Sequence, residues 1–184
     1  MLDAPRVMVA TCLALVLTSQ VVFAQTDAPQ VTVSSGYAFL SDGSTHFKTG
    51  VLVDVGVAVT DRFQIVTDVG HHRGTKKFVG FDANFSEISA LFGPRFVARG
   101  ADVTAFFQGL VGGARVRSGI TDSSEQLLSL VAFTAQLGGG LLIRLTQTGV
   151  GLRLGADFQW LTDDEFRNTQ FRLNAGLSFG LGRR

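Results

Sequence analysis

The chain has 184 residues and a formal net charge of +1, with 16 Lys and Arg against 15 Asp and Glu. This balance excludes the strongly basic surface that is typical of nucleic-acid-binding proteins, so we expect no nucleic-acid partner. Charged residues make up only 17% of the chain, against about 25% in ordinary soluble domains. Cys12 is the only cysteine, which excludes a disulfide framework.

The N-terminal residues 1–24 have the pattern of a cleaved secretory signal. Arg6 precedes an apolar run that begins at Val7, and the small residues Val22 and Ala24 occupy the positions that a signal peptidase inspects. The apolar run is shorter than the roughly 20 residues that a membrane-spanning helix needs. We therefore expect an exported protein whose mature domain covers residues 25–184.

A two-residue alternation of apolar with small or polar side chains follows in eight segments, and this period predicts β-strands. Residues 170–181 show it best, because Phe171, Leu173 and Leu177 alternate with Arg172 and Asn174. In chain order, the predicted strands cover residues 31–40, 49–59, 62–72, 87–98, 102–116, 130–145, 149–160 and 170–181. Strand 102–116 is less regular, and we expect a bulge at Gly112 and Gly113.

The connections between these segments alternate in length. The tight turns cover residues 60–61, 99–101 and 146–148, whereas residues 41–48, 73–86, 117–129 and 161–169 form longer loops. Short periplasmic turns and longer outer loops give this pattern in outer-membrane barrels. A soluble ligand-binding barrel would have the same period with its faces exchanged. However, the polar positions hold few charges and all three lysines lie in predicted loops, which favours a lipid-facing apolar surface.

Three features carry a resemblance to a known family: the export signal, the eight alternating segments, and the two pieces 91–96 (Leu-Phe-Gly-Pro-Arg-Phe) and 151–158 (Gly-Leu-Arg-Leu-Gly-Ala-Asp-Phe). In these features the chain resembles the small outer-membrane β-barrels that include the OmpA transmembrane domain and OmpX/Ail-type proteins. The resemblance covers the mature chain. It implies an all-β, eight-stranded antiparallel up-and-down transmembrane β-barrel in the outer membrane. It also implies that the outer-membrane assembly machinery inserts the protein, although the family's terminal Phe is displaced inward to Phe179.

Charged residues at the inward-facing positions of the predicted strands form the first candidate site. The expected interior charge network comprises Asp54, Asp68, Glu87, Arg95, Arg144, Arg153, Asp157 and Arg172. Counting from the turns places Asp157 opposite Arg172 and Asp54 opposite Asp68, and we expect Arg95 and Arg153 to reach across the lumen. Because eight strands leave an interior just wide enough for side chains, this pairing favours a closed lumen.

Two other groups of residues invite a functional interpretation. His71 and His72 could act as a base or bind a metal, but neighbours on a strand face opposite sides of the sheet. We therefore expect no catalytic residue, no metal site and no cofactor. The second group is basic and follows predicted strand ends, where it could bind phosphate groups of lipopolysaccharide in the outer leaflet: Arg73, Lys76, Lys77, Arg115 and Arg117.

The sequence thus predicts an integral outer-membrane barrel with a structural or surface-interaction role and a closed, ion-paired interior. Two alternatives remain open: a narrow porin-like channel for small or hydrophobic solutes, and a membrane-embedded enzyme that modifies lipids. The expected partners are outer-membrane lipid, including lipopolysaccharide, and the assembly machinery. The sequence does not identify an external partner for the surface loops.

Overall fold

The structure is a computed structural model that describes residues 29–41, 47–78, 81–120, 126–147, 149–163 and 167–183. Within strands, the side chains of some terminal residues lie outside this description, including those of Lys76 and Lys77. The predicted signal over residues 1–24 also lies outside the described residues. No helix in the described ranges is long and apolar enough to cross a membrane.

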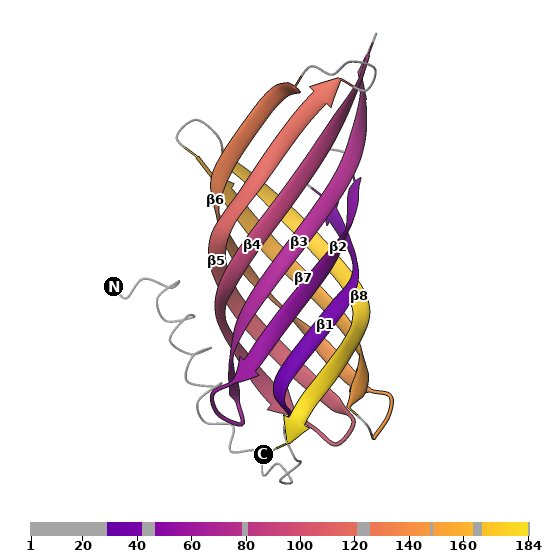
Figure 1. Ribbon diagram of the computed structural model, residues 1–184, viewed down its shortest axis with the longest axis vertical. Coiled ribbons are helices and arrows are strands. Elements are labelled where there is room, and N and C mark those ends of the chain that lie inside the picture. Colours follow the sequence, from indigo (N-terminus) through magenta and orange to yellow (C-terminus); the bar gives the residue numbers. More distant parts are fainter. Residues whose placement is uncertain are drawn as a thin grey trace, which may run out of the picture.

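Eight antiparallel strands form one closed barrel in which each strand pairs with its neighbours in sequence and β1 pairs with β8 (Figure 1). The strands are β1 (Pro29–Ser41), β2 (Phe47–Ala58), β3 (Phe63–Phe78), β4 (Phe81–Arg99), β5 (Val103–Ile120), β6 (Gln126–Arg144), β7 (Val150–Thr162) and β8 (Arg167–Arg183). The predicted all-β, eight-stranded up-and-down barrel is confirmed.

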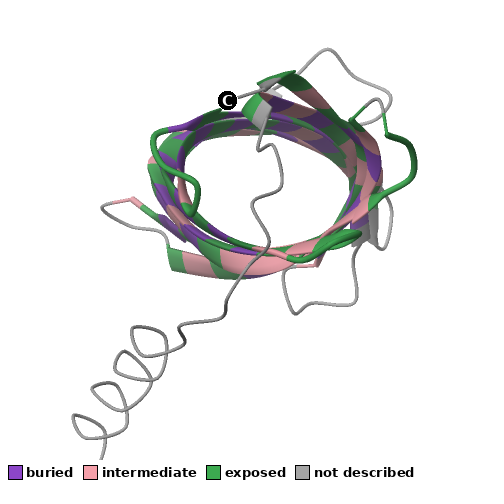
Figure 2. Cartoon of the chain, turned by 90° about the horizontal axis from the view of Figure 1, so that it is seen from below, coloured by how far each residue is buried: buried purple, intermediate pink, exposed green. Residues whose placement is uncertain are grey.

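Buried and exposed residues alternate along every strand, as Figure 2 shows in a view along the barrel. The outward positions carry large exposed apolar side chains, which we call the apolar belt. Each strand contributes to this belt, for example Tyr37, Val53, Val69, Phe92, Phe107, Leu137, Phe158 and Leu173. Most inward positions are small or polar. An apolar exterior around a polar interior is the arrangement of a transmembrane barrel.

The central strands extend further outward than the sequence indicates. The predicted loops over residues 73–86 and 117–129 are largely strand, because β3 pairs with β4 up to Phe78 and Phe81. These predictions were wrong for a physical reason. Above the apolar belt the outer face of a strand has no need to be apolar, so the alternation disappears while the backbone pairing continues.

The irregularity in β5 also lies elsewhere than predicted. Pairing between β5 and β6 is continuous through Gly112 and Gly113, and the register shifts only between Ser118 and Gly119. Phe106 and Gln108 face inward, whereas Arg115 faces outward and is exposed. Strict alternation explains all three orientations, so no bulge is needed between them.

Candidate functional site: a charged lumen and a basic outer face

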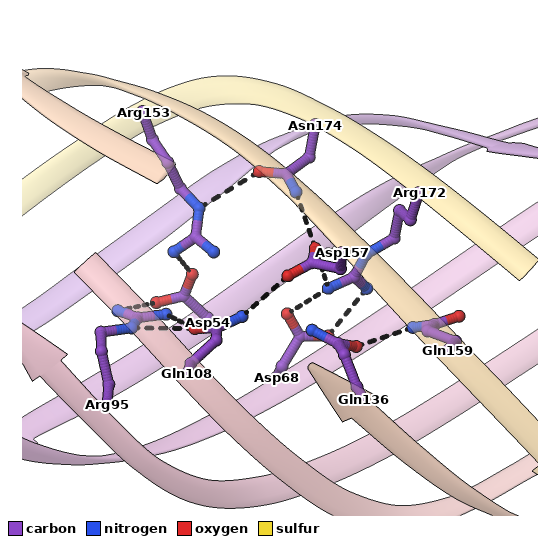
Figure 3. Close-up of polar contacts among 10 residues, drawn as sticks. All are labelled: Asp54, Asp68, Arg95, Gln108, Gln136, Arg153, Asp157, Gln159, Arg172 and Asn174. Atoms are coloured by element: carbon purple, nitrogen blue, oxygen red, sulfur yellow. Dashed lines mark hydrogen bonds and ion pairs between the residues drawn. The ribbon is translucent and has the colours of Figure 1, made fainter. Parts of the chain in front are cut away.

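A continuous set of polar contacts crosses the middle of the lumen, and we call it the lumen network (Figure 3). All of its side chains are at most 5% exposed. They come from six of the eight strands, β2, β3, β4, β5, β7 and β8. The members are Asp54, Asp68, Arg95, Gln108, Arg153, Asp157, Arg172 and Asn174.

Asp54 holds two arginines that approach from opposite parts of the barrel wall. Arg95 Nη1 of β4 donates to Asp54 Oδ1 at 3.2 Å, and Arg153 Nη1 of β7 donates to Asp54 Oδ2. Both guanidinium groups also lie 4.8 Å from the ring centre of Phe106. A cation over an aromatic face is attracted by the ring quadrupole, so Phe106 helps to position both arginines around one carboxylate.

Arg172 connects two acidic residues on either side of it. Its Nη1 and Nη2 donate to the two carboxylate oxygens of Asp68 at 3.0 and 2.9 Å, and its Nε donates to Asp157 Oδ2 at 3.1 Å. Asp157 and Arg172 are direct cross-strand partners, as are Asp54 and Asp68. The bidentate geometry matches the planar guanidinium, which makes this the best-formed pair of the network.

Two amide side chains join the two halves of the network. Gln108 accepts from Arg95 Nε at 2.9 Å and donates from Nε2 to Asp157 Oδ1 at 3.2 Å. Asn174 accepts from Arg153 Nε at 3.3 Å and donates to Asp157 Oδ2 at 3.0 Å. The network contains three aspartates and three arginines and is therefore neutral. Such balance matters because a buried charge without a partner is strongly unfavourable.

Glycines in the wall leave room for these side chains. A Cβ at Gly138 would lie 2.7 Å from the carboxylate carbon of Asp157, its cross-strand partner. A Cβ at Gly155 would lie 2.6 Å from Asn174 Oδ1. Both distances are below any normal carbon contact, so a Cβ at either position would displace the network side chain that it meets.

A second polar layer lies above the network and contains the remaining interior acid. Glu87 Oε2 accepts from Lys48 Nζ of β2 and from Gln170 Nε2 of β8, both at 3.1 Å. The alternation predicts Lys48 at the end of the loop 41–48, whereas the residue lies in β2 and is buried. It shares its parity with Asp54, which is the signal that could have identified it.

Seven of the eight residues expected in the interior charge network are buried in the lumen, and Arg144 is the exception. Asp54, Asp68, Arg95, Arg153, Asp157 and Arg172 form the lumen network, while Glu87 belongs to the layer above it. Arg144 is the last residue of β6, and its side chain is exposed. Arg144 has the inward parity, but a residue at the open end of a strand is not buried by parity alone. The fourth buried base of the interior is therefore Lys48 and not Arg144.

The two neighbouring histidines face opposite sides of the wall. His72 is fully buried in the lumen beside its cross-strand partner Glu87. His71 is half-buried on the outer face, where its Nε2 lies 3.3 Å from Ser86 Oγ and accepts from Arg73 Nε at 3.3 Å. No group of three or more His, Cys, Asp or Glu side chains in the described ranges could hold a metal ion.

The basic residues near the outer ends of the strands form part of an ordered surface. Arg73, Ser86 and Arg117 are paired across β3, β4 and β5, and Arg115 lies in the adjacent row of outward residues. All three arginines are exposed, and each lies beyond the last large exposed apolar residue of its own strand, Val69 in β3 and Val111 in β5. Within the described part of the chain, none forms an ion pair, in contrast to Arg95, Arg153 and Arg172. The side chains of Lys76 and Lys77 lie outside the described residues.

No protein-family model and no curated protein matches the sequence. Solved structures do match. The attachment invasion locus protein Ail of Yersinia pestis is 18% identical, with a TM-score of 0.55 over 83% of this chain and 99% of Ail. Neisserial surface protein A is 13% identical, with a TM-score of 0.60 over 82% of this chain and 96% of the neisserial chain. The chain therefore has the fold of the small eight-stranded outer-membrane barrels.

Proposed function

We propose that the protein is an integral component of the outer membrane that does not conduct and that acts through its outer surface, in a structural or surface-interaction role. The observation that carries this proposal is the neutral lumen network, in which side chains from six strands meet across the barrel. An open pore would leave these charges hydrated and facing water. Here they are buried against one another, which supports a closed interior.

Planar-bilayer recording tests the closed interior. We expect the purified, folded protein to insert without steady conductance above the bare bilayer. Reproducible ohmic channels that scale with protein concentration would contradict the proposal and favour the passive-channel alternative. An Arg172→Ala variant is a useful comparison, because it removes the side chain that connects Asp68 with Asp157 across the lumen.

The outer arginines support outer-leaflet lipid, including lipopolysaccharide, as the partner. Arg73, Arg115 and Arg117 have no described acidic partner, and each lies beyond the last large exposed apolar residue of its own strand. We infer that they reach the level where a membrane presents phosphate groups. Guanidinium groups bind phosphate through paired, charge-assisted hydrogen bonds. A phosphorylated glycolipid offers several phosphates in that plane, so the row across β3, β4 and β5 fits such a head group.

Thermal unfolding in nanodiscs tests this partner. We expect lipopolysaccharide to raise the unfolding temperature more than phosphatidylglycerol does, and the double variant Arg73→Gln/Arg117→Gln to lose most of that increment. Arg144→Gln is the matched control, because Arg144 is exposed at the periplasmic end of β6. An equal response of both variants would contradict the assignment of the outer arginines. An equal effect of both lipids would identify phosphate alone as the ligand.

One contact favours a second candidate function, the modification of lipids. His71 Nε2 lies 3.3 Å from Ser86 Oγ on the outer face, within reach for a base that activates a hydroxyl. Arg73 donates to the same nitrogen, and no described carboxylate contacts His71 to orient its ring. Lipid profiles of cells with Ser86→Ala and His71→Ala separate the two functions. An unchanged profile eliminates the enzyme, while loss of a fatty acid only in the wild type establishes it.

A further inference from the structure

The second polar layer contains most of the buried polar atoms that have no hydrogen-bond partner. In the described part of the chain, twelve buried side-chain nitrogen and oxygen atoms form no hydrogen bond. Eight of them lie on the outer side of the lumen network, on inward-facing residues that are at most 2% exposed. These residues come from five strands and complete the second polar layer: His72 (both ring nitrogens), Glu87, Ser89, Thr134, Gln136, Gln159 and Gln170. Because buried polar groups are nearly always hydrogen-bonded, such a cluster points to a ligand.

The backbone register brings these side chains together. Gln159 is the cross-strand partner of both Gln136 and Gln170, and His72 is the partner of Glu87. The hydrogen bond from Gln170 Nε2 to Glu87 Oε2, at 3.1 Å, crosses from β8 to β4 and joins these two groups. The unpartnered atoms therefore line one part of the lumen and are not scattered along it.

The lumen network closes this layer on its periplasmic side. A Cβ on Gly70 would lie 2.9 Å from Ser89 Oγ, 3.0 Å from His72 Cε1 and 3.6 Å from Arg172 Nη1, so side chains of the layer and of the network meet at this point. Figure 3 shows Gln136 and Gln159 toward the end of the network that holds Asp68 and Arg172.

The outer side of the layer is less tightly closed. Lys48, which bonds to Glu87, has a side chain that is 11% exposed, whereas that of Glu87 is 1% exposed. A flexible lysine at this position can move aside for a small molecule. The layer thus has the form of a blind site with its entrance at the outer end of the barrel.

The charges of the layer argue against an ion as the occupant. Lys48 Nζ already faces Glu87 Oε2 at 3.1 Å, and Arg172 is held by Asp68 and Asp157. An anion would find no unpaired base here, and a cation would lie beside Lys48 and Arg172 without an unpaired carboxylate. Burial of an uncompensated charge is strongly unfavourable, so the occupant should be neutral.

The unpartnered atoms include both donors and acceptors. Oxygen atoms of Glu87, Gln159 and Gln170 accept, whereas Gln136 Nε2 donates. The hydroxyl groups of the layer can do both, and a neutral imidazole offers one donor and one acceptor. An alcohol hydroxyl also donates and accepts, so a molecule that carries several hydroxyl groups matches this mixed set.

We propose that the second polar layer is a binding site for one small neutral polyhydroxy compound, a short sugar alcohol or a monosaccharide, which enters from the outer end. The interior of an eight-stranded barrel is either filled by side chains or holds one small ligand. In this barrel the lumen network fills one part, and the layer above it holds the ligand. This inference goes beyond the proposed function, because a blind site binds a solute without conducting it.

Titration of the purified, folded barrel with glycerol, erythritol and glucose tests the proposal. The detergent must lack a sugar head group, because an alkyl glucoside would itself offer hydroxyl groups. The chain contains only three histidines, so a sample with isotope-labelled histidine gives few ring-nitrogen signals in NMR spectra. We expect at least one compound to bind saturably and to shift the signals of His72 but not those of His71, which lies on the outer face. Absence of saturable binding would overturn the proposal, as would a larger shift with potassium chloride or phosphate.

Two glutamine substitutions locate the site. Gln159→Leu removes an unpartnered acceptor of the layer and should weaken binding about three- to tenfold. Gln64→Leu is the matched control, because Gln64 is equally inward and buried and also has an unpartnered Oε1, but it is the cross-strand partner of Arg95 below the layer. We expect it to leave the affinity unchanged.

A smaller substitution covers the case in which Gln159→Leu does not fold. Ser89→Ala removes one unpartnered oxygen and little volume, and it should also weaken binding about three- to tenfold. A heat-dependent gel shift verifies folding of each variant. Equal affinity of the wild type, Ser89→Ala and Gln64→Leu, or a loss in Gln64→Leu alone, would assign binding to another part of the barrel and overturn the proposal.

Discussion

Replacement of Arg172 by methionine tests the energetics of the lumen network directly. The substitution removes both bonds to Asp68, at 3.0 and 2.9 Å, and the contacts to Asp157 at 3.1 Å. Asp157 keeps amide donors from Gln108 and Asn174. Asp68, fully buried, loses the only ion-pair partner that it has among the described residues. Removing one partner of a buried pair costs about 3–5 kcal/mol.

The companion substitution Asp68→Asn separates a lost contact from an unpaired charge. In the double variant no carboxylate remains at position 68, so Arg172→Met/Asp68→Asn should be less destabilised than Arg172→Met alone. We expect a coupling energy of about 2 kcal/mol, within the range for residues in direct contact. The single variant Asp68→Asn should cost less than Arg172→Met, because Arg172 keeps its pair with Asp157.

Urea unfolding in lipid vesicles measures these free energies. Trp160 is the only tryptophan in the chain and is 41% exposed on the apolar belt, so its emission reports transfer from lipid to water. Additive costs in the double variant would refute the reasoning, because they would show that Arg172 and Asp68 do not stabilise one another. A stability of Arg172→Met within about 1 kcal/mol of the wild type would refute it equally.

Three further substitutions test the wall of the barrel. Val55→Arg in the apolar belt should lower the free energy of unfolding by about 2–4 kcal/mol in the same assay, whereas an arginine in a periplasmic turn should lower it little. Equal stability of the two variants would contradict the assigned faces. Gly138→Ala should lower the free energy of unfolding by about 1–3 kcal/mol, because the new Cβ displaces Asp157. Gly109→Ala is the control and should be tolerated, because its Cβ meets only a leucine side chain at 3.7 Å. Phe106→Leu removes the ring beneath two guanidinium groups and should cost about 1–3 kcal/mol, and a neutral effect would show that the ring does not position them.

The sequence predicts the parts of this structure that depend on local geometry. Alternation identifies the eight strands and their faces, and a hairpin turn sets the register of the strands that it joins. Counting from the turns therefore places Asp54 opposite Asp68 and Asp157 opposite Arg172, as the structure confirms.

Contacts between strands that are not neighbours depend on how the sheet closes. Arg172 and Asp68 lie on β8 and β3, and their approach follows from the tilt and stagger of the whole barrel, which no single hairpin specifies. Lys48 was missed for a different reason. The alternation weakens near the outer end of β2, where the bilayer no longer imposes apolar residues, so the predicted strand begins at residue 49, two residues after the observed start at Phe47.

The same loss of constraint hid the outer ends of β3 and β6. Residues 74–78 and 126–132 show little alternation, and both segments continue beyond the ends of the pairing with β2 and β7. Their strand conformation follows from the hairpin partners that extend with them. A pattern shaped by lipid thus identifies the membrane-spanning part of the barrel but not the part that projects from it.

The most direct test of the account is the gel mobility of the protein from isolated outer membranes, with and without boiling in detergent. A closed barrel with a bonded β1–β8 seam and a paired lumen should remain folded in detergent and migrate differently until it is boiled. We predict this heat-dependent shift in the outer-membrane fraction. Absence of a shift, with recovery of the protein in the soluble periplasmic fraction, would contradict the transmembrane barrel and the functions proposed from it.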